Sequence, residues 1–218
     1  MPRRTLFPLV AALVLLAGCS RSYSDAYTTQ PPTTEAPAPT TTTPESPAAA
    51  EPIAFTGTGL DLHTAAPVSQ AAQDAAWAGV LQTLNQYLEA AVLTPLRSGG
   101  PAGDLTPLFT SLAVDRVMSL GPDRFAFIDE NLPPASDLRQ EAALVAMTAL
   151  AGSDGVMSVI AAALDLRLTG QVNGGPMTLT RAGEVVLVPE GGAWRIDAWD
   201  LKVTRTLAGQ TTTTTVRA

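Results

Sequence analysis

The chain has 218 residues, 46% of them hydrophobic and 15% charged, with a formal net charge of −7 at pH 7. This length is enough for one domain with a sizeable hydrophobic core. The acidic balance argues against nucleic acid as a partner, because proteins that bind phosphate backbones present a basic face. Cys19 is the only cysteine, which excludes an intramolecular disulfide and a zinc site built from several thiols.

The chain opens with a short basic start and an apolar run. Two arginines precede the run 6–16, which has the length of a signal-peptide core and is too short to span a bilayer as a helix. The run ends in Leu-Ala-Gly-Cys at residues 16–19, which resembles the lipobox of bacterial lipoprotein precursors. The resemblance implies that residues 1–18 are a removable signal peptide, that Cys19 is lipidated, and that the protein is anchored on the outer face of the cell membrane.

Residues 19–67 are rich in threonine, proline, alanine and serine, in runs such as the one from Thr40 to Pro44. Such a composition buries too little apolar surface to offset the entropy of the chain, so we expect a disordered tether behind Cys19. His63, the one histidine, falls at the end of this segment, so we expect no catalytic histidine in the domain. The use of arginine, alanine, threonine and proline is typical of a GC-rich bacterial genome, such as that of an actinobacterium.

A folded domain is predicted for residues 68–208, and it begins with helices. Apolar residues recur at spacings of three and four from Trp77 to Ala91, the pattern of an amphipathic helix, with Ser69 as its N-cap. Pro95 and Gly99-Gly100 are expected to end it. Thr106-Pro107 predicts the start of a second helix, and residues 123–130 predict a short third one.

Residues 138–151 carry conflicting signals. A capping-box pattern at Asp137 and Gln140, followed by helix formers, favours a helix. The next segment, 156–169, alternates apolar and polar residues as a strand does, and Asp154-Gly155 is a turn signal. A strand there needs a hairpin partner, and a tight turn at Asp154-Gly155 offers residues 142–151 as that partner. We therefore predict a strand for 138–151.

Further turn signals divide the remainder into strands. A long strand is expected at 177–188, with a bulge at Gly183, and a last strand at 194–206. Residues 209–218 are expected to be a disordered tail. Simple alternation along the last strand predicts two faces, Trp194, Ile196 and Ala198 on one, and Arg195, Asp197, Trp199 and Leu201 on the other.

The predicted order is three helices followed by long antiparallel strands, and the last hairpin contains Gly-Gly-Ala-Trp-Arg-Ile at residues 191–196. This arrangement resembles the cone-shaped fold of the NTF2-like superfamily. The resemblance implies an α+β domain in which about three helices pack on a curved antiparallel sheet of four or more strands, with a pocket between helices and sheet. It implies no particular reaction, because this superfamily includes isomerases, dehydratases and binding modules alike.

Asp165 and Asp197 are the candidate cavity acids, because the isomerases that the chain resembles place an aspartate base inside the cone and aspartate is uncommon in strands. The alternative for Asp165 is an exposed outer face, with a cross-strand ion pair to Arg181 or Arg195. The sequence shows no cofactor loop. A metal site would need a cage of carboxylates alone, and Asp129-Glu130 with Asp123 are expected instead to cap and solvate a short helix.

These observations predict a membrane-anchored lipoprotein of the cell envelope whose domain docks on an envelope protein without catalysis. Two alternatives remain open. One is the capture of a small apolar ligand by the aromatic residues of the cone, and the other is an isomerase-like enzyme that uses a cavity aspartate.

Overall fold

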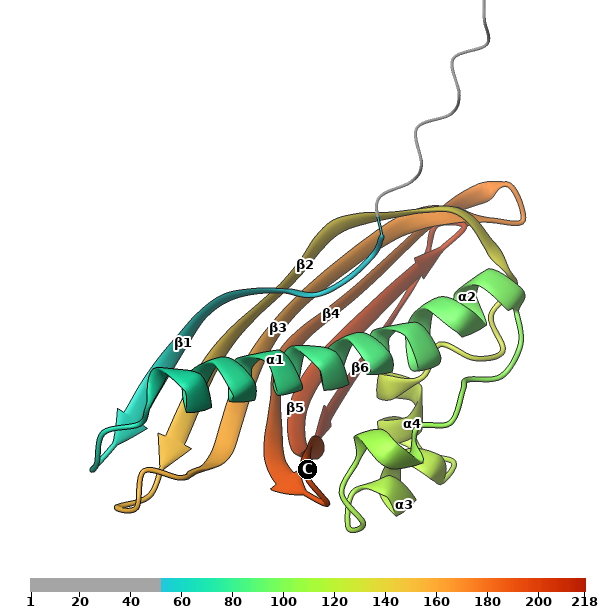
Figure 1. The fold of residues 1–218 in the computed structure, drawn as a ribbon. Coiled ribbons are helices and arrows are strands. Elements are labelled where there is room, and N and C mark those ends of the chain that lie inside the picture. Colours follow the sequence, from blue (N-terminus) through green and yellow to red (C-terminus); the bar gives the residue numbers. More distant parts are fainter. Residues whose placement is uncertain (1–51) are drawn as a thin grey trace, which may run out of the picture. The chain divides into compact units, whose positions relative to one another are not determined.

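The computed structural model describes residues 52–218, in which a long helix crosses one face of a curved sheet (Figure 1). The predicted signal peptide, Cys19 and most of the predicted tether lie outside the described residues. The elements are β1 (Thr56–Thr64), α1 (Gln70–Tyr87), a π-helical turn (Leu88–Leu93), α2 (Thr94–Ser98), a 3₁₀ turn (Thr106–Leu108), α3 (Val114–Met118), α4 (Pro122–Phe127), β2 (Ala135–Ala151), β3 (Met157–Val172), β4 (Gly175–Glu190), β5 (Ala193–Leu207) and β6 (Gln210–Arg217).

The six strands form one mixed sheet in the order β1-β2-β3-β4-β5-β6. β1 runs parallel to β2, and the other neighbours are antiparallel. The strand predicted for 138–151 is confirmed, since β2 pairs with β3 along its length. Alternate residues from Ala143 to Ala149 are buried on the face that α1 covers, so the tertiary pairing outweighs the local helix propensity. The α+β class and the curved sheet agree with the sequence-based expectation, but the sheet is mixed and not wholly antiparallel, because β1 adds to β2 in parallel.

α1 begins where the sequence predicts. The Ser69 hydroxyl accepts a hydrogen bond of 3.3 Å from the backbone N–H of Ala72, which caps the first turn. The helix does not end at Pro95. It passes through the π-helical turn into α2 and ends at Gly99, whose φ of 67° is readily adopted by glycine. The π-helical turn is wider than an α-helical turn, and it accommodates Pro95, which has no backbone N–H to donate.

The second predicted helix is much shorter than expected. A single 3₁₀ turn follows Thr106-Pro107, and the chain then extends before α3. Phe109 forms a bridge with Ile196, and the Thr110 N–H donates to the Ile196 carbonyl at 2.9 Å. This pairing with β5 satisfies the backbone groups that a longer helix would have paired internally. The third helix is confirmed as α4, although it ends before Asp129.

Both predictions of disorder next to the domain are wrong where the structure describes the chain. Residues 56–64, assigned to the tether, form β1, and residues 210–217, assigned to a tail, form β6. In β6, Val216 is buried, and the hydroxyls of Thr211 and Thr213 lie 3.0 and 3.2 Å from threonine hydroxyls of β5. The polar composition indicated disorder, but threonine is β-branched and favours strands that can pair.

The bulge in the last hairpin lies at Asp197 and not at Gly183. Val186 pairs with Ala198 and Leu187 with Ile196, which leaves Asp197 as an additional residue in β5. The bulge changes the alternation, so Ile196 and Trp199 are buried on the same face. The two faces predicted from simple alternation are therefore wrong beyond Asp197.

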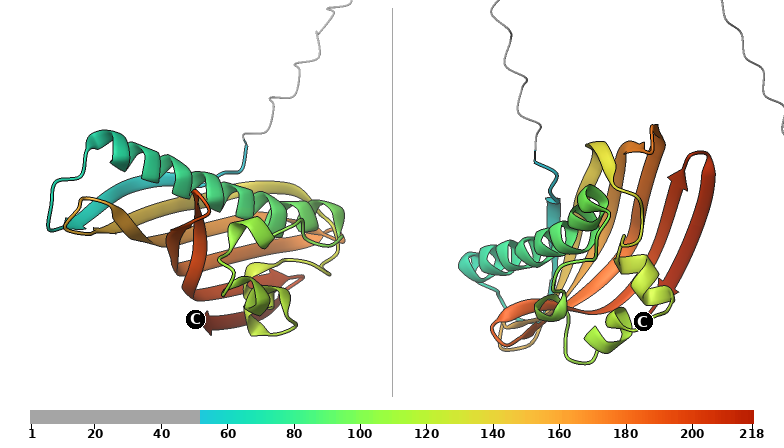
Figure 2. Two further views of the ribbon diagram at one scale, coloured as in Figure 1. Left: turned by 60° about the horizontal axis from the view of Figure 1, so that its bottom comes forward. Right: turned by 90° about the vertical axis from the view of Figure 1, so that its right-hand side faces the viewer.

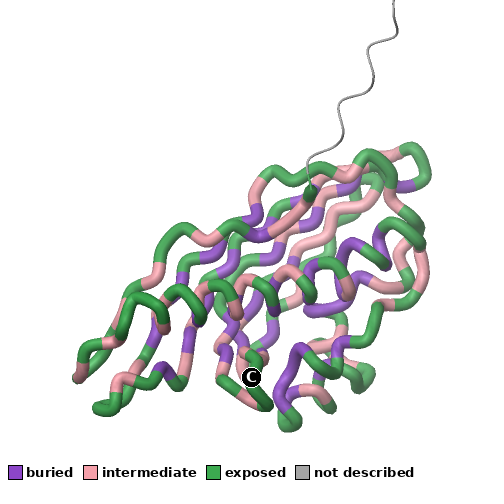
Figure 3. Tube along the Cα trace, viewed as in Figure 1, coloured by how far each residue is buried: buried purple, intermediate pink, exposed green. Residues whose placement is uncertain are grey.

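Two further views show the helices on one face of the sheet (Figure 2). The hydrophobic core lies between them and this face. Buried and exposed positions alternate along the central strands (Figure 3). Each strand therefore presents one set of side chains to the core and the other to solvent.

Candidate functional site

Asp165, the first candidate cavity acid, lies on the outer face of β3. It is exposed, and its neighbours Leu164 and Leu166 are buried on the covered face. Strand alternation places the carboxylate on the side away from α1. In the described part of the chain, Asp165 forms an ion pair with neither Arg181 nor Arg195, the two partners named in the alternative; Arg181 lies on the buried face and pairs with another acid.

Asp197, the second candidate, is half-buried at the bulge of β5. Its Oδ1 accepts a hydrogen bond of 2.7 Å from the hydroxyl of Thr110. The bond joins β5 to the extended segment before α3, next to the bridge between Phe109 and Ile196. Asp197 thus holds a connection between two segments of the fold, which is a structural role.

An acid that was expected to cap and solvate a short helix is instead buried, one residue beyond the C-cap position Ile128 of α4. Asp129 is 1% exposed, and it accepts from Arg181 Nη2 at 2.9 Å and from Arg205 Nε at 2.5 Å. Arg181 is completely buried in β4 among inward-facing apolar residues. The position of Arg181 in the strand could have indicated this cluster, because an arginine at an inward position of a strand requires a buried partner.

Tyr87 completes this cluster from the last residue of α1. Its hydroxyl accepts from Arg181 Nη1 at 2.5 Å and donates to the carbonyl of Phe127 at 3.0 Å. Burial raises the pKa of Tyr87 well above its usual value, with Arg181 opposing part of the effect, so the hydroxyl is neutral at physiological pH. Arg205 also donates to the carbonyl of Phe125 at 2.6 Å, which ties α4 to β5.

The space beside this cluster is closed. The gap next to Asp129 and Arg205 has no room for a water molecule. On the other side, the rings of Tyr87, Phe109, Phe127 and Trp199 pack edge to face, with centroids 4.9–6.2 Å apart. We call these aromatic and charged residues together the closed end. Its polar groups join α1, α4, β4 and β5, and Tyr87, Asp129 and Arg181 are almost completely shielded from solvent.

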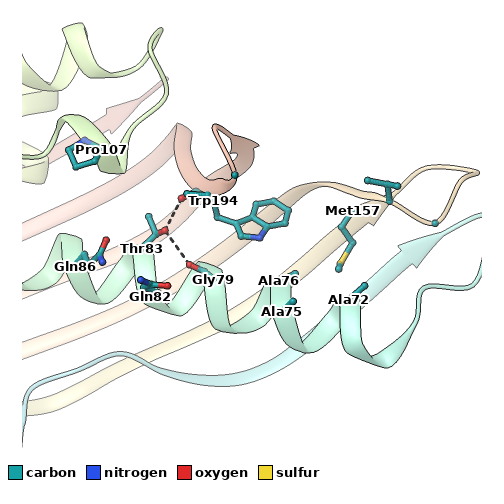
Figure 4. Close-up of a pocket in the computed structure, with 14 residues that line it drawn as sticks. Ala72, Ala75, Ala76, Gly79, Gln82, Thr83, Gln86, Pro107, Met157 and Trp194 are labelled. Atoms are coloured by element: carbon teal, nitrogen blue, oxygen red, sulfur yellow. Dashed lines mark hydrogen bonds between the residues drawn. The ribbon is translucent and has the colours of Figure 1, made fainter.

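The open site lies beyond the closed end, between α1 and the ends of two hairpins (Figure 4). This groove has a volume of about 530 Å³. Its floor is a row of small residues on α1, and its walls come from the β2–β3 hairpin, the β4–β5 hairpin and the 3₁₀ turn. The residues that define it best are Ala72, Ala76, Gly79, Pro107, Met157 and Trp194.

Trp194 is fixed in place at the side of the groove. Its carbonyl accepts a hydrogen bond of 2.7 Å from the Thr83 hydroxyl. Its indole lies directly on Gly79, where an added Cβ would come within 2.8 Å of Cδ1. Glycine at this position therefore allows the ring to approach the helix backbone.

The groove is uncharged. None of the residues that line it is acidic or basic, although the chain as a whole carries 33 such side chains, 13 basic and 20 acidic. Its polar side chains are neutral, with Gln82 and Gln86 one helical turn apart on α1. Such a lining offers hydrogen bonds and apolar contact.

Within residues 52–218, no cluster of histidine and acidic side chains has the arrangement of a metal site. No helix in the same part of the chain is long and apolar enough to cross a membrane. No family model matches the chain, and comparison with curated proteins and with solved structures gives no match.

Proposed function

We propose that this protein is a lipoprotein anchored to the cell membrane through Cys19, with an NTF2-like domain that holds an uncharged, extended peptide of an envelope partner in the groove beside α1. The lipobox-like residues 16–19 support the anchor, and the curved sheet crossed by a long helix supports the fold. The uncharged groove between α1 and Trp194 is the observation that carries the binding function.

A small apolar ligand inside the cone fits the structure less well than a peptide in the groove. The aromatic residues that could line an internal cavity pack against one another at the closed end. An isomerase-like reaction also lacks its acid, because Asp165 is exposed on the outer face and Asp197 is bonded to Thr110. Asp129, the remaining buried carboxylate, is occupied by two arginines.

The shape and chemistry of the groove favour a peptide. Small side chains on α1 let a main chain approach the helix closely, and the amides of Gln82 and Gln86 can donate to and accept from its peptide groups. Trp194 offers an aromatic surface for an apolar side chain, a common anchor in protein interfaces. A charged segment would lose its hydration without gaining a counter-charge.

The binding function is tested by photo-crosslinking from the groove in the native membrane. A photoreactive amino acid replaces Gln82 in the full chain, and the matched control carries it at exposed Asp165 on the outer face. We expect a crosslink from Gln82 alone, mapping to an uncharged segment of one protein. Equal labelling from both positions, or labelling of lipid only, overturns the proposal.

The segment identified in this way is then synthesised and titrated against the full chain. Trp194→Ala is expected to weaken binding tenfold or more, about 1.4 kcal/mol, while Asp165→Asn leaves the affinity unchanged. Equal affinity of the Trp194→Ala variant and the unmodified chain excludes the groove as the binding site.

The anchor has a separate test. Cys19→Ser is expected to move the protein from the membrane fraction to the soluble fraction and to abolish incorporation of a labelled fatty acid. Retention of the label in this variant excludes Cys19 as the lipidation site.

A further inference from the structure

The two edges of the sheet differ in how they are protected. At the β1 edge, the register is interrupted between Gly57 and Gly59, Asp61 is exposed, and Trp77 of α1 packs against Gly57. A bulge, a charge and a covering helix are the usual means by which an edge strand avoids pairing with another chain. The β1 edge therefore has little capacity to accept a further strand.

The β6 edge has none of these devices between Gln210 and Thr215. This stretch contains no proline, glycine or charge, and five of its six residues are threonine. It is exposed, and among the described strands it pairs with β5 alone. An exposed, regular edge of this kind presents a row of free backbone donors and acceptors to a further strand.

The strand is nonetheless held firmly at its other end. Val216 is buried, the carbonyl of Arg217 accepts from Arg116 Nη2 at 3.3 Å, and the N–H of Ala218 donates to the carbonyl of Trp199 at 2.8 Å. Since α4 also packs against β6, the exposed stretch projects from an anchored strand. An edge that is ordered beforehand loses less entropy when it pairs.

We propose that β6 is a dimerisation edge, which pairs antiparallel with β6 of a second copy of this chain around a two-fold axis at Thr213. In that register Thr211 lies opposite Thr215 of the second copy, and Thr212 lies opposite Thr214. Arg217, the one charged residue of β6, lies opposite the uncharged Gly209 of the second copy. The pairing therefore brings no like charges face to face.

The contacts between β5 and β6 show how such a pair is stabilised. Thr204 lies opposite Thr213 and Thr206 opposite Thr211, with hydroxyl oxygens 3.2 and 3.0 Å apart. Threonine pairs across antiparallel strands are favourable, and pairing of two β6 strands extends the same ladder into the second copy. Because the β1 edge is protected, the assembly closes as a two-fold dimer and does not grow into a fibre.

The first test is a cysteine scan along β6, in the full chain carrying Cys19→Ser and purified in mild detergent. Thr213→Cys is expected to give a disulfide-linked dimer on mild oxidation, because a residue on the two-fold axis faces its own copy. Thr211→Cys and Thr215→Cys are expected to crosslink efficiently only when mixed with each other. Ser158→Cys, exposed on the outer face of β3, is the control. A yield at Thr213 no higher than at Ser158 overturns the proposal.

The second test is the mass of the same Cys19→Ser chain by sedimentation. We expect the mass of this chain to double as its concentration rises. The Thr213→Lys variant is expected to keep the mass of a monomer, because a charge on the edge opposes pairing. The Thr213→Val variant keeps a β-branched side chain and is expected to dimerise. Circular dichroism checks that both variants fold. A chain that stays monomeric without a β6 substitution, or a Thr213→Lys variant that still dimerises, contradicts the proposal. Neither test depends on the lipid anchor or on the groove.

Discussion

The two tryptophans of β5 have opposite environments, although they are only five residues apart. Trp199 is 2% exposed, packs edge to face on Phe127 and donates through Nε1 to Asp123 at 2.9 Å. Trp194 is half-buried at the side of the open groove. The bulge at Asp197 lies between them and changes the side to which the later residues point. One strand thus builds both the closed end and the groove.

The closed end and the groove also differ in how they treat polar groups. At the closed end, Asp129 and Arg181 are almost completely removed from solvent, so each depends on the other for compensation. In the groove the polar groups are neutral amides and hydroxyls. We expect substitutions at the closed end to change stability and substitutions in the groove to change binding.

The largest expected effect is that of Asp129→Ala. The substitution leaves Arg181 buried without a counter-charge and removes the acceptor of Arg205 Nε, so the free energy of unfolding should fall by an amount at the upper end of ~3–5 kcal/mol. Urea denaturation measures the loss. Exposed Asp165→Ala is the control and should change stability by no more than about 0.5 kcal/mol. Similar stabilities of the two variants would contradict a structural closed end.

Substitution of each of the two tryptophans of β5 distinguishes the two regions directly. Trp199→Ala removes a buried ring from the aromatic cluster and should lower the free energy of unfolding by about 3–4 kcal/mol. Trp194→Ala removes a half-buried ring and should cost less than half as much, in the same urea titration. If the Trp194→Ala variant is the less stable of the two, the groove is part of the core and the distinction fails.

Much of the fold is predictable from the sequence because its signals are local. Ser69 caps the first helix through its own hydroxyl, and the turn at Asp154-Gly155 sets the hairpin between β2 and β3. The strand at 138–151 also required the reasoning that a strand at 156–169 needs a partner. Where two local signals conflicted, the need for pairing gave the correct result.

The errors come from interactions between distant segments. The bulge at Asp197 depends on how β5 pairs with β4, and simple alternation cannot locate it. The partner of Arg181 lies 52 residues earlier in the sequence, so no local pattern connects the two. β6 was mistaken for a disordered tail because its threonines bury little surface of their own and gain order from β5.

Tyr87→Phe is expected to have a smaller effect on stability than Asp129→Ala or Trp199→Ala, and its dependence on pH makes it specific to the closed end. Loss of the hydroxyl leaves Arg181 Nη1 and the Phe127 carbonyl each without a partner, so we expect the free energy of unfolding to fall by about 2 kcal/mol at neutral pH.

Burial raises the pKa of Tyr87 in the folded state, whereas in the unfolded chain the hydroxyl ionises near ~10. Its stabilising contribution is therefore fully present below pH ~10 and declines as the pH rises further, because the unfolded state loses the proton first. Urea titrations at pH 7 and above pH ~10 should show the difference between the unmodified chain and the variant narrowing. A constant difference would mean that the hydroxyl reaches solvent and that the closed end is open to water.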